Sequence, residues 1–456
     1  MLIQRLSLAL KYQMDHSLTE RADTCPVCAE DSVTLHQCCP NKKDSLCEPC
    51  WSKIISGEIE RGRIGSLFLG ELLCNFCNKP IERNRLPKDL QSRLNNILLT
   101  IPRTKTPKSI EDFNYSYKDS NHLTHSLTNE KFVFLSQRHY NALGACIDVY
   151  IQSVMKSDQW NYKEIWLPEK SENVDDHHDQ VNIFTSNDFE TNENGCLILL
   201  QGSGVVRLGQ WARSCCINES LDIGSMFPYM KKAKEHGLSV IILNPNQTSY
   251  VEKQICDNGT TTLSDRKTNS TEQQSSATNR QADDKKTTDS DNDLISYYLS
   301  PDPLPYPITK KIPNLSTNRE HVLHVYDNVI SKCPAKKFYI VAHSAGGDGL
   351  MFLLRKRQNT ILKKTWKVAF TDSVHSVLPL ESNEIKNFLK LHAIHFVASD
   401  QPMGEELDSV YDFSHGSACQ EVSAGHPKHE YTSGYCVEGV FNFFFPSDHN
   451  IDRTAF

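Results

Sequence analysis

A short apolar run that leads into a serine-containing turn constrains this 456-residue chain more than any other feature. Residues Phe338 to Ala342 are apolar throughout, as in a strand that is buried on both faces. Ser344 follows, with the small residues Gly346 and Gly347 after it, and the run 348–354 has the composition of a helix. The pattern predicts a strand, a sharp turn that carries the serine, and a helix. A serine presented on such a turn is a candidate nucleophile.

Further apolar runs alternate with helix-like stretches over the larger part of the chain. Strands are expected at 196–200, 239–243, 367–371 and 393–397, and helices at 228–236, 319–332, 347–357 and 382–391. Continuous apolar runs are typical of strands covered on both faces, and the alternation implies right-handed crossovers. The sequence therefore predicts an α/β fold of the α/β-hydrolase type, with a mostly parallel sheet and helices on both of its faces.

The order of polar residues along the chain fits a catalytic triad. In α/β-hydrolases the nucleophile comes first, the acid second and the histidine last. Ser344 would attack, His429 would take its proton, and Asp400 at the end of a predicted strand would orient the imidazole. Asp372, which ends an earlier predicted strand, is the alternative acid. The alternative bases are His426 and His375, although such residues also occur at strand ends for turn bonding and helix capping.

A second glycine-containing turn follows the predicted strand 196–200. In α/β-hydrolases the loop at this place donates backbone N–H groups to the oxyanion, together with the residue after the nucleophile. Gly202, Ser203 and Ala345 are therefore the candidate oxyanion residues. An ordinary tight turn between a strand and a helix would have the same composition, so this pattern by itself leaves both interpretations open.

Eight of the sixteen cysteines lie in the segment from Cys25 to Cys77. Pairs with C-x2-C spacing place two thiolates where one tetrahedral zinc ion can take both. Clustered pairs in an intracellular chain favour metal binding over disulfides. The sequence predicts two zinc ions, bound by Cys25, Cys28, Cys38, Cys39, Cys47, Cys50, Cys74 and Cys77. Buried or reactive free thiols are the alternative.

Composition divides the chain and excludes some function classes. We expect a zinc module at 20–90, a linker at 91–130, and a hydrolase-like domain formed by 131–249 and 317–450. The intervening segment 250–316 is poor in aliphatic residues, which predicts disorder. The formal net charge of −7 argues against direct nucleic-acid binding. No apolar run reaches the roughly 18 residues of a membrane-spanning helix, so no membrane partner is expected.

The cysteine-rich segment resembles a RING finger, in particular the first RING of the RING-between-RING ubiquitin ligases. The resemblance rests on the knuckles at 24–28, 46–51 and 73–77, the pair Cys38-Cys39, and the helix-like segment from Trp51 to Arg63. The usual histidine is missing, so either both Cys38 and Cys39 bind zinc or Asp44 takes its place. The resemblance implies recruitment of a ubiquitin-conjugating enzyme, or an interaction role alone.

Residues from about 105 to 446 resemble the argonaute-binding-protein-two domain family, whose animal branch is the family-172 cotranscriptional regulators. The resemblance rests on the signature 201–213 and on supporting stretches at 109–113, 140–144, 217–222, 240–245, 341–347, 371–375 and 422–425. Two residues depart from the family pattern. Gln201 replaces the histidine that usually precedes Gly-Ser-Gly, and Ala345 replaces the tyrosine that usually follows the serine.

The family resemblance implies a protein of the nucleus, with the cytoplasm as a second location. It also implies contacts with argonaute, chromatin or splicing factors. Three functions follow for the chain as a whole. The first is a scaffold in transcription-linked RNA silencing or splicing. The second is a serine hydrolase that uses Ser344 on a small ester or acyl group. The third is a ubiquitin-ligase subunit that uses the zinc module.

Overall fold

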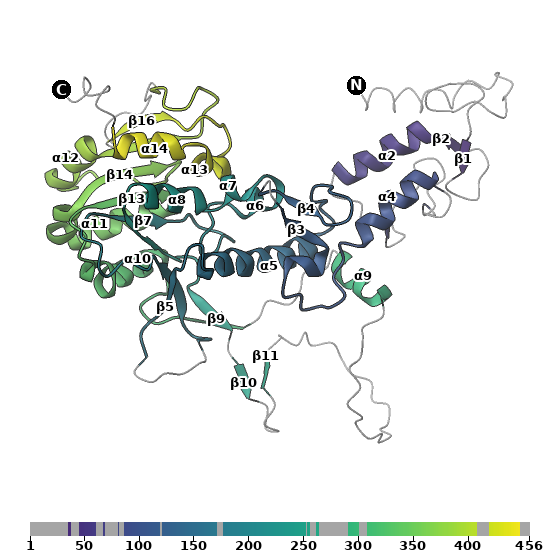
Figure 1. Ribbon diagram of the computed structural model, residues 1–456, viewed down its shortest axis with the longest axis horizontal. Coiled ribbons are helices and arrows are strands. Elements are labelled where there is room, and N and C mark those ends of the chain that lie inside the picture. The colour runs from purple at the N-terminus through teal and green to yellow at the C-terminus, as the bar shows by residue number, and fades with distance from the viewer. Residues whose placement is uncertain are drawn as a thin grey trace. The chain divides into compact units, whose positions relative to one another are not determined.

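The computed structural model describes residues 35–37, 45–60, 67–68, 81, 86–118, 121–170, 177–251, 253–255, 261–263, 291–300, 308–407 and 419–446. The chain divides into two compact units (Figure 1). The first is drawn from residues 1–116, 124–146 and 276–304, and the second from 117–123, 147–275 and 305–456. Each unit has its own cluster of buried apolar side chains.

The described part of the first unit is mainly helical. It comprises β1 (Leu35–Gln37), β2 (Ser45–Cys47), α2 (Glu48–Glu60), α4 (Lys88–Leu98), η3 (Ile110–Phe113) and α9 (Asp291–Leu299). Three further elements run from one unit into the other, namely β3 (Tyr115–Tyr117), β4 (Leu123–His125) and α5 (Gln137–Lys156). In α4 the apolar residues Leu90, Leu94 and Ile97 recur at helical spacing and are buried. They join Trp51 of α2 in one apolar cluster.

Two segments differ from the expectation of linker and disorder. The predicted linker 91–130 contains most of α4 and the element η3, whose Ile110 and Phe113 are buried. The predicted disordered segment 250–316 contains α9, whose Leu294 and Tyr298 belong to the apolar cluster of the first unit. The reason is local composition, since α9 has five apolar or aromatic side chains within nine residues. Most of 257–293, whose shortage of aliphatic residues was the basis for predicting disorder, lies outside the described residues.

An eight-stranded sheet organises the second unit. Its strands are β5 (Lys163–Leu167), β6 (Val181–Thr185), β7 (Cys196–Leu200), β8 (Ser239–Ile242), β13 (Phe338–His343), β14 (Thr365–Thr371), β15 (Ala393–Val397) and β16 (Gln420–Ser423). The order across the sheet is β16-β15-β14-β13-β7-β8-β6-β5. All neighbours are parallel except for β6, which runs antiparallel to both β5 and β8. Two short antiparallel pairs lie outside the sheet, β9 (Ser249–Val251) with β12 (Thr309–Lys311) and β10 (Lys253–Ile255) with β11 (Thr261–Leu263).

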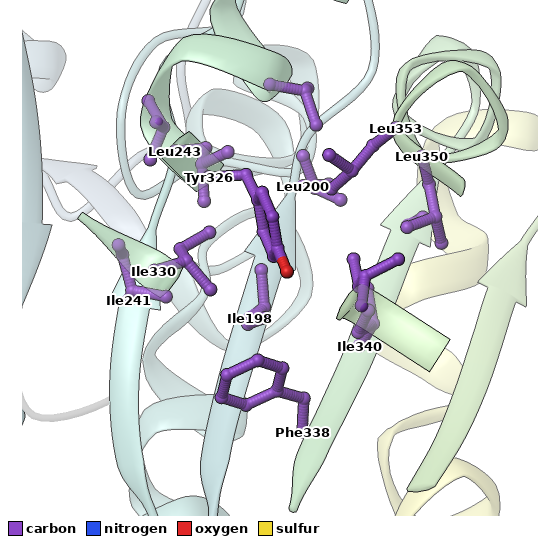
Figure 2. Close-up of a cluster of buried hydrophobic side chains, with 14 of the residues drawn as sticks. Ile198, Leu200, Ile241, Leu243, Tyr326, Ile330, Phe338, Ile340, Leu350 and Leu353 are labelled. Carbon is purple, nitrogen blue, oxygen red and sulfur yellow. The ribbon is translucent and has the colours of Figure 1, made fainter. Parts of the chain in front are cut away.

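Helices connect these strands and cover the sheet. They are α6 (Arg213–Asn218), α7 (Leu221–Gly224), α8 (Phe227–Glu235), α10 (Asn318–Asn328), α11 (Ala345–Lys364), α12 (Asn383–His392), α13 (Thr432–Tyr435) and α14 (Val437–Phe444), with the 3-10 turns η4 (Ile330–Lys332) and η5 (His429–Tyr431). Successive side chains of a strand point to opposite faces. On β13, Phe338 and Ile340 pack in the cluster with residues of α10 and α11 (Figure 2). The intervening Tyr339 contacts Phe444 of α14, so the two faces have different helices.

The predicted fold class is confirmed as a mixed α/β structure with a large, mostly parallel sheet. The expected strands at 196–200, 239–243, 338–342, 367–371 and 393–397 are β7, β8, β13, β14 and β15, with bounds that agree to within two residues. The parallel arrangement matters for function because the carboxyl ends of parallel strands meet at one edge of the sheet. The turns after β7, β8, β13, β14, β15 and β16 therefore gather there.

Candidate functional site

Ser344 lies on a sharp turn between the central strand β13 and helix α11. Its φ of 51° and ψ of −124° lie outside the regions that residues other than glycine usually adopt. Backbone groups hold this conformation from several directions. The Ser344 N–H donates to the Thr371 carbonyl at 3.1 Å, and its own carbonyl accepts from the N–H groups of Gly347 and Val374 at 3.1 and 3.2 Å. Strained backbone that is fixed by several hydrogen bonds in this way is characteristic of functional turns.

Glycines let the neighbouring chain segments approach this turn closely. A Cβ added to Gly202 would lie 2.7 Å from Ser344 Cβ and 3.2 Å from Ser344 Oγ. A Cβ added to Gly346 would lie 2.7 Å from the carbonyl oxygen of Leu200. Any larger residue at either position would push the loop after β7 away from the serine. The structure therefore brings the glycine turn after β7 against Ser344.

Two backbone N–H groups beside Ser344 are available to a ligand. Within the described residues, neither the N–H of Ser203 nor that of Ala345 donates a hydrogen bond. Ser203 is exposed, and Ala345 is the first residue of α11, where the helix dipole also favours negative charge. This arrangement can receive an oxyanion.

His429 and Asp372 form a hydrogen-bonded pair at the same edge of the sheet. The His429 Nδ1–H donates to Asp372 Oδ2 at 2.6 Å. The other carboxylate oxygen of Asp372 accepts from the Ala398 N–H at 3.1 Å, and the Asp372 N–H donates to the Phe396 carbonyl at 2.7 Å. Asp372 therefore holds the imidazole in one tautomer, with Nε2 left to accept a proton.

The pair shifts the pKa values of both groups. The hydrogen bond to Asp372 raises the pKa of His429 above its ordinary value, and partial burial opposes this shift. Burial acts to raise the pKa of Asp372, but the hydrogen bonds from His429 and Ala398 outweigh it, so the pKa of the carboxyl is lowered. Both shifts favour the ion pair of a charged imidazolium and a carboxylate.

A second histidine, His343, lies beside His429. The two rings stack with their centroids 4.7 Å apart. His343 donates from Nδ1 to the Thr371 carbonyl at 2.8 Å and is 3% exposed. Burial lowers the pKa of His343 to about 4, and the charge of His429 adds to this effect, so the ring is neutral at pH 7. A neutral ring can pack against the His429 imidazolium without charge repulsion.

The remaining candidate acid and bases do not pair with His429 or Asp372 in the described residues, and the two histidines among them stack on aromatic rings. Asp400 is exposed and, within the described part of the chain, forms no hydrogen bond or ion pair with His429 or with another residue. His426 stacks on Tyr431 with ring centroids 4.2 Å apart, and His375 stacks on Phe370 at 3.7 Å. The structure therefore brings together the alternative acid, Asp372, and the first-choice base, His429.

Ser344 Oγ makes no hydrogen bond within the described residues, so its contact with His429 is not formed in this structure. In resting enzymes such contacts are often long and shorten only when substrate is bound. Sequence reasoning missed Asn246, whose side-chain amide donates to the Gly202 carbonyl at 2.7 Å. The sequence could have indicated Asn246, because it is a polar residue shortly after a buried strand. The turns after the neighbouring parallel strands β7 and β8 lie side by side, so a residue in one can contact the other.

Most of the predicted zinc ligands lie in parts of the chain that the structure does not describe. Six of the eight cysteines, and Asp44, lie outside the described residues. Cys47 ends β2 and Cys50 lies in α2, but their side chains are not described. Within the described residues no group of three potential metal ligands is found, and no helix is long and apolar enough to cross a membrane.

The Arb2 domain family model matches residues 106–403. The chain is 35% identical to "Cotranscriptional regulator ARB2A homolog" of Dictyostelium discoideum, over 75% of this chain and 81% of that protein. It is 33% identical to the Gallus gallus protein of the same name, over 80% of this chain and 87% of the relative. A solved histone deacetylase from Saccharomyces cerevisiae aligns with 67% of this chain and 98% of its own length, at 11% identity and a TM-score of 0.36.

Proposed function

The chain belongs to the Arb2 domain family, and from this premise we propose that it is a nuclear cotranscriptional regulator. The observation that carries the proposal is the similarity to curated relatives of that name over most of both chains. Because the alignments include most of each relative's length, the comparison concerns the whole domain rather than one motif.

The regulator would act as a scaffold for other proteins. The net charge of −7 favours protein partners over direct contact with nucleic acid. Argonaute, chromatin and splicing factors are the partners that the family resemblance implies. Under this proposal the second unit supplies the docking surface, and Ser344 is not needed for it.

A tagged full-length chain expressed in cells tests the scaffold. We expect the protein in the nucleus and on chromatin, with release when transcription is inhibited. The variant Ser344→Ala should bind chromatin as the wild type does. Exclusion from the nucleus would contradict the regulator, and loss of chromatin binding in Ser344→Ala would contradict a role that is independent of the serine.

The geometry of the site supports a second function, and we propose that the second unit is a serine hydrolase acting on a small ester or acyl group. Ser344 Oγ would bond to the acyl carbon while its proton passes to Nε2 of His429, held by Asp372. The N–H groups of Ser203 and Ala345 would stabilise the oxyanion. The alcohol would leave with the proton from His429, and water would then release the acid from Ser344.

Labelling with a fluorophosphonate tests the hydrolase. We expect one phosphonyl group per chain, located on Ser344 by mass spectrometry and absent in Ser344→Ala. The matched control is Ser157→Ala, which alters an exposed serine outside the site and should label like the wild type. An unlabelled wild-type chain would rule out the hydrolase and leave the scaffold.

The ubiquitin-ligase function is a third proposal, and the cysteine spacing is its support. It requires the zinc module and a charged ubiquitin-conjugating enzyme as partner. The purified full-length chain should then accelerate discharge of ubiquitin from that enzyme, and a zinc chelator should abolish the effect. An equal discharge rate with and without the chain would contradict it.

A further inference from the structure

The side chain of Asn246 connects two loops at the carboxyl edge of the sheet. It lies in the turn after β8, four residues beyond Ile242. Because Leu199 of β7 is paired with Ile242 of β8, this turn lies beside the loop that carries Gly202. The Asn246 amide donates to the Gly202 carbonyl at 2.7 Å and to the Val206 carbonyl at 3.1 Å. One side chain thus holds both ends of the loop 202–206.

The bond to Gly202 also orients the next N–H group. The Gly202–Ser203 peptide bond is trans, so its C=O and N–H point in opposite directions. With the carbonyl held by Asn246, the Ser203 N–H must point away from Asn246. It has no hydrogen-bond partner within the described residues, and Gly202 is so close to Ser344 that an added Cβ would lie 2.7 Å from Ser344 Cβ. The Ser203 N–H is therefore oriented before any ligand arrives.

The turn that carries Asn246 is itself held by buried polar groups. The neighbouring Asn244 is 1% exposed. Its backbone N–H donates to Nε2 of His321 at 3.1 Å, and its side-chain amide donates to Asn182 Oδ1 at 3.2 Å. Burial lowers the pKa of His321 to about 3, so this ring stays a neutral acceptor. The turn that carries Asn246 is thus hydrogen-bonded to both α10 and β6.

We propose that Asn246 is a positioning residue, which holds the loop 202–206 so that the Ser203 N–H is directed to the oxyanion formed at Ser344. This role rests on the proposed hydrolase function. It predicts that Asn246 acts on the transition state rather than on substrate binding, because the oxyanion exists only there.

Two measurements on the full-length chain test the role, one of which does not need activity. In protein labelled with [15N]glycine, the heteronuclear NOE of the Gly202 and Gly204 amides should fall in Asn246→Ala. The rate of fluorophosphonate labelling at Ser344 should fall about 10- to 100-fold, the range expected for a misplaced oxyanion donor. With p-nitrophenyl acetate, kcat should fall by a similar factor and KM should stay unchanged.

Asn192→Ala is the matched control, since its amide also donates to a loop carbonyl, that of Gly237 at 3.0 Å, but precedes β7 at the other end of the strand. It should change neither measurement. Asn246→Asp keeps the size of the side chain and removes the donor, so it should behave like Asn246→Ala even if the alanine variant is unstable. Unchanged glycine NOE values in both Asn246 variants would overturn the role.

The two proposals fail in different ways. If the wild type does not label, the hydrolase is excluded, and the inference about the oxyanion falls with it whatever the NOE values show. If the wild type labels at Ser344 and the Asn246 variants label at the same rate, the hydrolase stands and the positioning role is wrong. A fall in kcat accompanied by an equal rise in KM would also contradict it.

Discussion

At the scale of single residues, the pairing of His429 with Asp372 makes the site sensitive to pH. The pKa of His429 is raised from its ordinary 6.5, so the pairing stabilises the fold below pH 6.5 and this contribution is lost as pH rises through the raised pKa. The pKa of Asp372 is lowered from 3.8, so its contribution is present above pH 3.8 and is lost as pH falls through the lowered pKa. The pair contributes most between those two ordinary values.

Replacing the acid separates Asp372 from Asp400. In Asp372→Asn we expect the pKa of His429 to fall towards its ordinary value, as followed by NMR titration of the imidazole Cε1–H. The loss of stability near pH 5.5 should stay below about 1 kcal/mol, because the His429 side chain is 48% exposed and solvent screens the pair. Labelling of Ser344 should become slower, since the imidazole is no longer oriented.

Asp400→Asn is the control for this prediction, because Asp400 is exposed and, in the described part of the chain, forms no hydrogen bond or ion pair with His429. It should leave the His429 titration unchanged. If Asp400→Asn lowered the pKa of His429 and Asp372→Asn did not, the acid first chosen from the sequence would be the correct one and the pairing described above would be wrong.

At the scale of elements, helix α9 shows how a polar segment supplies part of a core. Leu294 and Tyr298 lie one helical turn apart and are buried in the cluster of the first unit. The Tyr298 hydroxyl donates to the Thr104 carbonyl at 2.6 Å, and its own carbonyl accepts from the Ser136 hydroxyl. A helix far along the chain thereby becomes part of a unit formed mostly by the N-terminal residues.

Truncating Leu294 should destabilise that unit. Leu294→Ala removes a side chain that is 3% exposed, and such changes cost about 2–5 kcal/mol. Hydrogen exchange of the α4 amides should accelerate accordingly, because Leu90 and Leu94 share the cluster. The control is Ser296→Ala on the exposed side of α9. Equal exchange in both variants would show that α9 does not stabilise the unit.

At the scale of the whole molecule, the chain combines an α/β unit with a cysteine-rich segment, and six of the eight predicted metal ligands of that segment lie outside the described residues. Zinc sites of this kind couple metal binding to folding, because the unfolded chain has no preformed ligand set. The function of the segment therefore depends first on whether it binds metal.

Metal content decides that question. The purified full-length chain should contain two zinc ions, measured by mass spectrometry of the metal. Replacing Cys74 and Cys77 by serine together should reduce this to about one. Cys419→Ser, outside the cluster, should leave it at two. A chain purified without metal chelators that holds no zinc would contradict the zinc module and the ubiquitin-ligase proposal with it.

The sequence by itself determined the central strands of the sheet and the place of Ser344. Runs such as Phe338–Ala342 are continuously apolar, which is the composition typical of a strand covered on both faces. It did not indicate β5, which is partly exposed and has a mixed pattern, or β6, whose short buried run includes the polar residues Asn182 and Thr185. Nor did it indicate that α9 would pack with residues nearly two hundred positions earlier.

Only the tertiary structure decided which acid pairs with His429 and which side chain holds the loop at Gly202. Asp372 and Asp400 both follow parallel strands, so both reach the same edge of the sheet, and spacing along the chain cannot choose between them. The choice depends on the turn after β14, where Asp372 adopts a φ of 42° and accepts the Ala398 N–H. Such contacts join residues that follow different strands, and these residues come close together only when the sheet has formed.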